Sequence, residues 1–433
     1  MVDGVRHYDA IVIGAGLSGL VAAGLLAEAG ARVYLIAKGG GFLHFTSGCV
    51  DVWGDGTPNP RASVTRVSRE LPNHPYARAG TESLEKGVAF FSHVMADAGY
   101  PFEGSLDRIR LMPTAIGSVR ATCLTPATMS AGDLVDTAPT LIAGFSNYRD
   151  FYPPYLAANL RRQASINVTG AYLDLPHLHG RKHLLSTDLA HDFGNAQFRE
   201  EVGRNVRRIL GGAERVGFPA VLGGERAQEV STHLQTLIQS SVFEISTLPP
   251  SVPGIRLHTI LRRSLTRRRV RVEIGFWTGG RIVGTRAESL VVRSAGHETT
   301  YTADCFVLAT GGTGGGGIRA FPDGRLQETV FDLPVRGPND RNAWARAEFL
   351  SADPQPYSEI GLGVDARLRP LDRSDRAIEN VFVTASNLPG WDPVRERSGE
   401  GVALATGWRV AREALDLLGL RSESTPVTAR AQS

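Results

Sequence analysis

Residues 8–38 read YDAIVIGAGLSGLVAAGLLAEAGARVYLIAK, which is an apolar strand, a glycine-rich turn, a helix and a second apolar strand. Gly14, Gly16 and Gly19 fill a G-x-G-x-x-G frame between the strand and the helix, where that motif binds phosphates. The first glycine allows a tight turn, the second lets the backbone approach a pyrophosphate, and the third lets the helix pack against the strand. The helix N-terminus then offers unpaired N–H groups to the phosphates. This stretch predicts a unit that binds the pyrophosphate of a dinucleotide or flavin.

The end of the second strand lacks a residue that such a unit usually has. An acidic side chain there normally holds the ribose hydroxyls of an adenine nucleotide. Here the strand runs from Val33 to Lys38 without Asp or Glu. The sequence therefore indicates phosphate binding more strongly than adenosine binding. Either backbone groups hold the ribose, or the ligand has none.

The composition is that of an ordinary globular protein with room for two domains. The chain has 433 residues, 42% of them hydrophobic and 21% charged. A net charge of +3 is too small to indicate nucleic acid as a partner. The three cysteines, Cys49, Cys123 and Cys305, lie far apart, so they alone can build neither an iron–sulfur cluster nor a zinc site. We therefore predict no metal site in this chain.

The apolar segments also bear on location. The first apolar run is interrupted by the glycine turn and does not read as a signal peptide. No run of 18 or more apolar residues is present, so we predict no membrane-spanning helix. These features predict a cytoplasmic protein, unless a partner holds it at a membrane.

Apolar strands late in the chain return it to the first sheet. Strands are predicted at 270–274, 281–283 and 289–292, with a turn at Gly279-Gly280 between the first two. A further strand is predicted from residue 301 onward, and it ends in Ala-Thr-Gly-Gly at 309–312. A third strand that returns to this sheet is predicted at 380–386, before a helix that begins near Ser398 and runs through Leu415. Further helices are predicted at 82–98 and 197–210. We predict an α/β fold with a discontinuous Rossmann-like flavin-binding domain (1–49, 256–317 and 376–421), an inserted α+β cap or substrate domain (50–255 and 318–375) and a flexible tail (422–433).

Several longer tracts carry a resemblance to a known family. They are GFLHFTSGCVDVWG at 41–54, PTAIGSVRATCLTPATMSAGDL at 113–134, FSNYRDFYPPYLAANL at 145–160 and LPPSVPGIRLHTILRR at 248–263. Together with the glycine turn and ATGG at 309–312, they resemble flavoproteins related to succinate dehydrogenase and fumarate reductase. The chain is most similar there to the B subunits of anaerobic glycerol-3-phosphate dehydrogenases. The resemblance covers most of the chain.

The resemblance implies a flavin-dependent oxidoreductase chain in a complex of three different proteins. That complex oxidises sn-glycerol 3-phosphate to dihydroxyacetone phosphate and passes electrons to the quinone pool at the inner membrane. The implied partners are a catalytic flavoprotein, the A subunit, and an iron–sulfur protein, the C subunit. The implied cofactor is FAD, with FMN as the alternative. Two other interpretations stay open: a stand-alone FAD-dependent oxidoreductase of the fumarate reductase or ketosteroid dehydrogenase type, and a scaffold protein that keeps the fold without using a flavin.

The loops at the ends of the predicted strands are the candidates to hold the flavin. In the family, the loop containing His44 passes close to the isoalloxazine ring, and His44 is a candidate for covalent attachment or for ordinary loop hydrogen bonds. A helix that opens at Ser398 would stabilise the reduced, anionic flavin through its N-terminus. The predicted cofactor-binding residues are Gly14, Ala15, Gly16, Leu17, Ser18, Gly19, Ala37, Lys38, His44, Thr46, Ser47, Gly48, Thr310, Gly311, Gly312, Ser386, Ser398, Gly399, Gly401 and Val402.

The candidate catalytic residues are Arg256, His258 and Arg149. A phosphorylated substrate needs an arginine that can bind two oxygens, and an alcohol that gives up hydride needs a base. Prolines precede a helix predicted to begin at 254–255 and run through Leu261, so Arg256 and His258 lie near its first turn. We expect the two to form an anion-attracting patch that faces the cleft between the domains. The alternative is that these arginines form structural ion pairs or face a partner protein.

Overall fold

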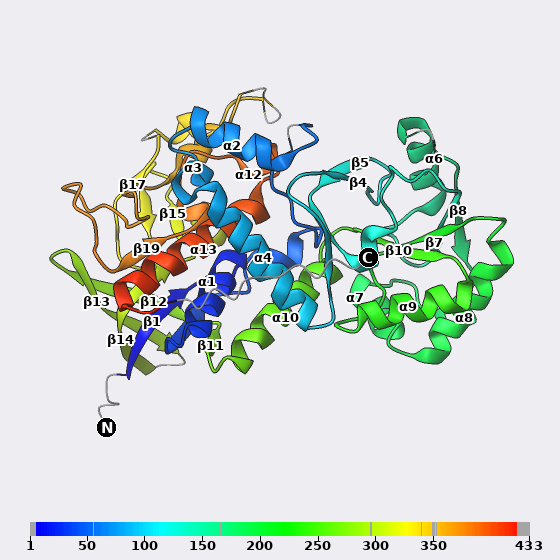
Figure 1. Ribbon diagram of the computed structural model, residues 1–433, viewed down its shortest axis with the longest axis horizontal. Helices are drawn as coiled ribbons and strands as arrows, with labels where there is room; N and C mark the ends of the chain where they lie inside the picture. The colour runs from blue at the N-terminus through cyan, green and yellow to red at the C-terminus, as the bar shows by residue number, and fades with distance from the viewer. Residues whose placement is uncertain are drawn as a thin grey trace.

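The chain folds around two separate sheets that lie side by side, at the left and right of Figure 1. The computed structural model describes residues 6–54, 56–164, 166–294, 297–338, 340–348, 351 and 353–421. The tail predicted at 422–433 lies outside these residues. Among the described residues, no helix is both long and apolar enough to cross a membrane.

The larger sheet carries the nucleotide-binding signature. Its strand order is β11-β2-β1-β14-β13-β12, with β19 beside β14. The bounds are β1 Arg6–Ile13, β2 Val33–Ala37, β11 Arg271–Ile274, β12 Trp277–Val283, β13 Arg286–Ser294, β14 His297–Leu308 and β19 Val381–Val383. The strands β11, β2, β1, β14 and β19 pair in parallel, whereas β12 and β13 add an antiparallel edge. All of β2 is buried, as expected of a parallel strand covered on both faces.

The predicted returns to this sheet are present, with one error of detail. The pair Gly279-Gly280, predicted as a turn, lies inside β12. A Cβ atom on Gly280 would lie 2.0 Å from the ring of Phe331, so glycine is needed there for close packing. The turn between β12 and β13 is instead at Gly284, whose φ is +60°.

A layer of helices covers this sheet. It comprises α1 Leu17–Glu28, α4 Thr81–Asp97, α10 Val252–Arg267 and α13 Gly399–Leu418, with the shorter α2 Pro60–Glu70, α3 Pro75–Ala79, α11 Gly312–Gly315 and α12 Pro393–Glu396 around it. The helix α13 packs against both α1 and α4, and α1 also packs against α10. The small pairs β15 Ile318–Ala320 with β16 Leu326–Glu328, and β17 Val335–Arg336 with β18 Gly361–Leu362, lie on the same side of the molecule.

This packing moves the domain boundary. Leu84 and Phe91 of α4 are buried in the same core as β1 and β14. Leu362 and Leu368 join that core as well. Residues 60–97 and much of 318–375, predicted to belong to the inserted domain, therefore pack with the nucleotide-binding domain.

The inserted domain is a second parallel sheet with its own core, at the right of Figure 1. Its strands are β7 Thr140–Phe145, β8 Val168–Leu173, β9 Arg215–Pro219 and β10 Ser241–Ile245, and its helices are α6 Pro153–Ala164, α7 Ser186–Asp192, α8 Ala196–Ile209 and α9 Ala227–Ile238. All the pairings are parallel, in the order β10-β9-β7-β8. The domain is thus more regular than the predicted α+β cap. Chain order reverses between β7 and β9, and a ligand-binding crevice typically forms outside the carboxyl ends at such a point.

Short elements connect the two domains. They are β3 Phe102–Gly104 with β6 Leu124–Pro126, the hairpin of β4 Arg110–Pro113 and β5 Val119–Thr122, and α5 Ala127–Ser130. Leu111 and Val119 of the hairpin pack on the core of the inserted domain, whereas Leu124 belongs to the other core. The hairpin therefore brings side chains of the inserted domain to the boundary.

Candidate functional site

The glycine turn between β1 and α1 has the geometry that a pyrophosphate requires. Gly14 has a φ of +123°, and a Cβ atom there would lie 2.0 Å from the carbonyl oxygen of Ala309. A Cβ atom on Gly19 would lie 2.1 Å from the carbonyl oxygen of Gly14, so this glycine lets the helix approach the strand. A Cβ atom on Gly16, by contrast, would meet nothing within 4 Å. The turn is closed on two sides and open at Gly16, which fits a phosphate that approaches the backbone.

The N-terminus of α1 is electrostatically open as well. Its N-cap is Gly16, no side chain caps it, and no acidic residue lies in its first turn. The residues that follow, Leu17 and Ser18, are buried. The partial positive charge of the helix end is therefore not neutralised by the protein, which favours an anion. The strand β2 ends at Ala37 and is followed by Lys38, so no carboxylate stands at the usual ribose position.

The loop after β14 is tied to the third return of the chain by one buried side chain. Asn387 is fully buried, and its Oδ1 accepts from Thr310 Oγ1 at 3.0 Å and from the N–H of Gly312 at 2.9 Å. A Cβ atom on Gly312 would lie 1.9 Å from the carbonyl oxygen of Ser386. The predicted cofactor residues Thr310, Gly311, Gly312 and Ser386 thus lie together. Sequence reasoning missed Asn387, which fixes them.

The loop that contains His44 is held between the two domains. The N–H of Ser251, just before α10, donates to the carbonyl oxygen of His44 at 2.9 Å. From the inserted domain, Ser246 Oγ donates to the carbonyl oxygen of Ser47 at 2.9 Å. Because Ser246 directly follows β10, the carboxyl edge of the second sheet meets the predicted flavin loop. The two domains therefore share a boundary at Thr46, Ser47 and Gly48.

Cys49 follows this loop and is not a reactive thiol. Burial raises the pKa of Cys49 to about 12, and its Sγ lies 3.8 Å from Met129 Sδ. A thiol with a raised pKa is protonated at neutral pH and a poor nucleophile. Cys49 is therefore a packed loop residue.

Arg256 does not form the predicted anion-attracting patch with His258. It is 1% exposed, and its five N–H donors all have acceptors: two go to Glu244 oxygens, two to the carbonyl oxygen of Gly223 and one to Tyr100 Oη. Helix α10 begins at Val252, earlier than predicted, and residues two apart on a helix point in different directions. The expectation of a joint patch is therefore wrong.

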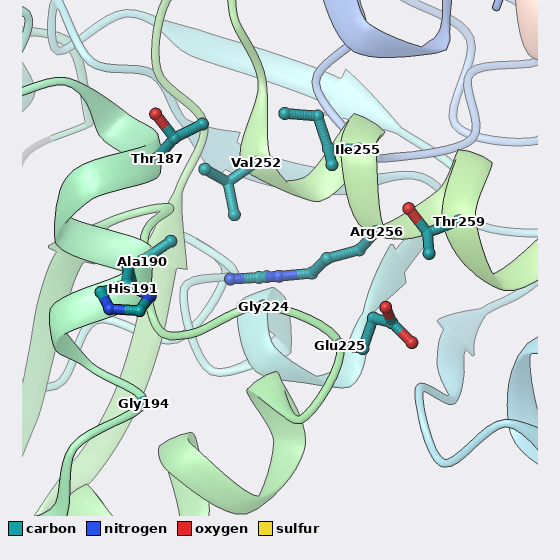
Figure 2. A pocket seen from close by; sticks show the side chains of 10 residues that line it. All are labelled: Thr187, Ala190, His191, Gly194, Gly224, Glu225, Val252, Ile255, Arg256 and Thr259. Carbon is teal, nitrogen blue, oxygen red and sulfur yellow. The ribbon is translucent and has the colours of Figure 1, made fainter.

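The cavity beside Arg256 is separate from the surroundings of His258 and has a volume of about 340 Å³. Figure 2 shows the guanidinium on its wall, between Val252 and Gly224. The donors seen there are already used by Glu244 and Gly223. This cavity therefore offers no free cation from Arg256.

His258 points instead toward the predicted flavin loop. It is 7% exposed, its ring meets the ring of His44 edge-on with centroids 5.0 Å apart, and its Nε2 has no hydrogen-bond partner among the described residues. A Cβ atom on Gly40 would lie 3.4 Å from that Nε2. Burial lowers the pKa of His258 to about 4, so the ring is neutral at neutral pH. A buried ring nitrogen without a partner is suited to a hydrogen bond with a bound molecule.

Arg149, the third catalytic candidate, is exposed and has no ion pair or hydrogen bond among the described residues. It lies between the end of β7 and the start of α6, beside the point where chain order in the second sheet reverses. The structure therefore does not bring Arg149 and Arg256 together in one phosphate site.

The start of α13 is pressed against the segment that follows the flavin loop. The N–H of Gly401 donates to the carbonyl oxygen of Asp51 at 2.9 Å, and a Cβ atom on Gly401 would lie 2.2 Å from Tyr76 Oη. Ser398 is fully buried and its Oγ donates to Glu396 at 2.8 Å. No side chain caps the helix, and an acidic residue, Glu400, lies in its first turn beside the partial positive charge of the helix end. Val402 is buried in the core.

Three charged residues at this helix start were not predicted. Arg120 of β5 forms an ion pair with Asp51, which is 4% exposed. Glu400, in the first turn of α13, is close enough to both for their charges to act on its pKa: the charge of Asp51 raises it and that of Arg120 lowers it. No sequence motif marks this group, because its members come from three distant parts of the chain.

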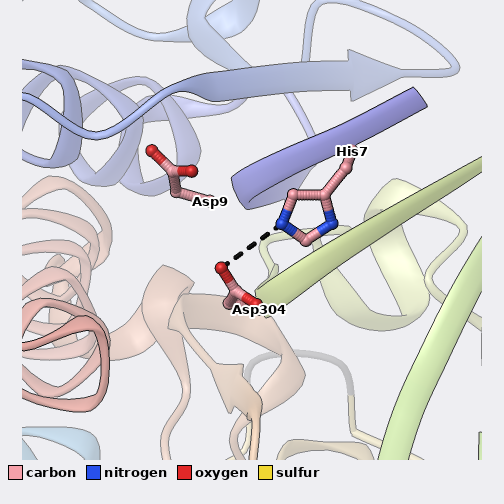
Figure 3. Close-up of side chains that lie close together, drawn as sticks. All are labelled: His7, Asp9 and Asp304. Carbon is pink, nitrogen blue, oxygen red and sulfur yellow. Dashed lines mark ion pairs between the residues drawn. The ribbon is translucent and has the colours of Figure 1, made fainter.

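One group of potential metal ligands lies away from this region. Figure 3 shows His7, Asp9 and Asp304, whose ligand atoms lie within 4.8 Å of one another. The Asp9 carboxylate already accepts from the backbone and the guanidinium of Arg32, and His7 pairs with Asp304 at 3.4 Å. Asp9 is roughly 16 Å along β1 from Gly14, at about 3.3 Å per residue, and His7 is farther still, so the group lies at the other end of the strand.

Comparison with known proteins agrees with this geometry. Residues 9–385 match the family described as FAD binding domain. The B subunit of the anaerobic glycerol-3-phosphate dehydrogenase of Vibrio cholerae is 30% identical over 428 residues, covering 95% of this chain and 97% of that protein. A probable B subunit of the same kind of enzyme from Halobacterium salinarum is 32% identical over 432 residues, covering 95% and 98%. A solved 3-ketosteroid delta1-dehydrogenase from Sterolibacterium denitrificans is 13% identical, with a TM-score of 0.44 over 95% of this chain and all of that one.

Proposed function

Because the chain belongs to the FAD-binding family of anaerobic glycerol-3-phosphate dehydrogenase B subunits, we propose that it is the flavin-carrying redox chain of such a dehydrogenase. In this role it takes part in the oxidation of sn-glycerol 3-phosphate to dihydroxyacetone phosphate. The observation that carries the proposal is the near-complete coverage of both chains, together with a glycine turn that is open at Gly16. FAD is the cofactor, and it supplies a two-electron acceptor for hydride.

The residues that would hold FAD lie in loops and helix starts at one edge of the first sheet. The turn at Gly14–Gly19 and the start of α1 would bind the pyrophosphate. The loop around His44–Gly48 and the start of α13 would flank the flavin. His258 supports this arrangement, since its unpartnered Nε2 lies beside the loop at Gly40 and His44. We therefore favour a cofactor contact for His258 over a role as catalytic base, because its lowered pKa makes it a weak base.

A phosphorylated substrate would bind between the flavin loop and the carboxyl edge of the second sheet. That edge reaches the loop through the Ser246–Ser47 hydrogen bond. Arg149 lies on the first loop of that edge, and no described residue uses its donors, which is what a phosphate needs from an arginine. Among the arginines predicted for this role, Arg149 is a better candidate than Arg256.

We further propose that electrons leave through other chains. The cysteines Cys49, Cys123 and Cys305 are all buried and free, so an iron–sulfur centre must come from another protein of the complex. A catalytic flavoprotein, the A subunit, and an iron–sulfur protein, the C subunit, would be those partners. They would hold this chain at the inner membrane and pass electrons to quinone.

The test is purification from a host that expresses the three proteins of the complex together. We expect a yellow complex whose extracted flavin from this chain is FAD by mass spectrometry, and whose absorbance bleaches with glycerol 3-phosphate. Rapid bleaching of this chain alone, without partners, would favour a stand-alone oxidoreductase. A chain that purifies without any flavin would favour the scaffold interpretation.

A further inference from the structure

Glu400, Asp51 and Arg120 form a charged group at the start of α13. Arg120 comes from the hairpin that joins the domains, Asp51 from the segment after the flavin loop, and Glu400 from the first turn of the helix. The Arg120–Asp51 ion pair crosses the domain boundary. The hydrogen bond from the N–H of Gly401 to the carbonyl oxygen of Asp51, at 2.9 Å, fixes the helix against Asp51.

This group lies close to where the reactive part of the flavin is expected. The helix α13 touches the start of α1 at Gly407, where a Cβ atom would lie 2.8 Å from the carbonyl oxygen of Ser18. Glu400 precedes Gly407 by about two turns, or about 10 Å at 1.5 Å per residue. The first turns of α13 therefore extend beyond the pyrophosphate turn to Asp51, in the segment that follows the flavin loop.

The hydrogen bonding of the group is incomplete. Asp51 is 4% exposed, yet its Oδ1 has no partner among the described residues. The Arg120 guanidinium contributes one nitrogen to Asp51 and has no other hydrogen-bond partner in the part of the chain that the structure describes. A buried carboxylate oxygen without a donor is costly and calls for a proton or a ligand.

The charges around Glu400 favour a proton on this group. Burial, and next the negative charge of Asp51, raise the pKa of Glu400 to about 7, against the smaller opposing effect of Arg120. Cys49 and Tyr76 also face Glu400, and burial raises the pKa of both, so they stay neutral. Two carboxylates that share one arginine leave one negative charge in excess, which a single proton removes.

We propose that Glu400, held against Asp51 and Arg120 at the start of α13, takes up one proton when the flavin is reduced. The inference rests on the proposed function for the source of that proton. Oxidation of a secondary alcohol would break one C–H and one O–H bond: the hydride would bring two electrons to FAD, the hydroxyl would release one proton as the C=O bond forms, and the Glu400 carboxylate would take up one proton in balance. Negative charge arriving on the flavin raises the proton affinity of a nearby carboxylate, so the two events favour each other.

The test is the pH dependence of the flavin midpoint potential, measured by absorbance during reductive titration of the FAD-loaded protein with a chemical reductant and mediators. For a two-electron couple, each proton taken up shifts the potential by about 30 mV per pH unit. We expect a slope of about 30 mV per pH unit below neutrality, which steepens toward about 60 mV above it, because only ionised Glu400 can accept a proton. A proton bound by the flavin itself would give the opposite curvature.

Two variants complete the test. Glu400→Gln should give about 30 mV per pH unit throughout. Glu413→Gln removes a carboxylate from the same helix, about 20 Å away, and should keep the wild-type curvature. A wild-type slope that never steepens, or a steepening that persists in Glu400→Gln, would overturn the inference. If glycerol 3-phosphate fails to reduce the flavin while the curvature is present, the proposed function fails and the proton uptake stands.

Discussion

Replacing Arg256 with alanine is expected to unfold the junction between the domains rather than to slow the chemistry specifically. Arg256 is 1% exposed and its partner Glu244 is fully buried. Without the guanidinium, Glu244 keeps, among the described residues, only the donors Thr128 Oγ1 at 2.7 Å and the N–H of Leu222 at 2.8 Å. A buried charge that loses its ion partner typically costs about 3–5 kcal/mol. That is a large part of the total stability of about 5–15 kcal/mol typical of a folded domain.

The assay is urea unfolding of the FAD-loaded protein, followed by tryptophan fluorescence. Arg263→Ala is the matched control, because Arg263 lies on the same helix but pairs with Glu225 at the surface with 60% of its side chain exposed. We expect that control to cost less than about 1 kcal/mol. Replacing both Arg256 and Glu244 with methionine should recover most of the loss, since no buried charge is left unpaired. An Arg256→Ala variant of wild-type stability and at least tenfold lower turnover would refute this reasoning, because such a result requires contact with substrate.

Three further predictions concern the cofactor, the substrate and pH. Gly16→Val should fold but lose FAD, because its side chain would enter the space left open for phosphate. Gly14→Ala should misfold, since its Cβ would lie 2.0 Å from the carbonyl oxygen of Ala309. Flavin absorbance reports the loss of FAD and circular dichroism reports the misfolding. Arg149→Ala should keep its stability and raise the KM for glycerol 3-phosphate about tenfold or more, a loss of about 1.4 kcal/mol in steady-state kinetics. The pKa of Glu400 is raised in the folded state, so its contribution to folding stability is present below about pH 4.5 and is lost as pH rises through about 7. Glu400→Gln should remove this pH dependence, which amounts to up to about 3 kcal/mol of unfolding free energy.

The glycine turn could be predicted from the sequence because its constraints are local. The roles of Gly14 and Gly19 depend on atoms of β1 and on the neighbouring strand end, and the motif implies both. The strands of the first sheet were predictable for the same reason, since each is a short apolar run between turn residues. Gly280 shows the limit of that rule: it reads as a turn, but it is small because Phe331 packs on it.

Long-range packing decided the features that the sequence could not predict. Arg256 and His258 are two residues apart, but their roles depend on helix phase and on what each side of α10 meets. One side meets Glu244 of β10, and the other meets His44 and Gly40. The domain boundary was misplaced for a similar reason. The amphipathic sequence pattern of α4 indicates that the helix has a buried face, but it does not indicate which of the two cores that face joins.

The many arginines of this chain illustrate how a structure separates structural cations from those that can bind an anion. A guanidinium has five N–H donors, and an anion can use only those that the protein leaves open. Arg256 spends all five, and so does Arg215, whose donors reach the carbonyl oxygens of Ala131, Asp133, Asp136 and Ala138 and the hydroxyl of Thr140. Among the described residues, the Arg120 guanidinium uses one donor and that of Arg149 uses none. Arg120 lies on the hairpin that joins the two domains, and Arg149 follows the carboxyl end of β7 in the second sheet. A sequence can name arginines as candidates to bind phosphate, but the number of N–H donors without a protein acceptor decides which of them can bind it.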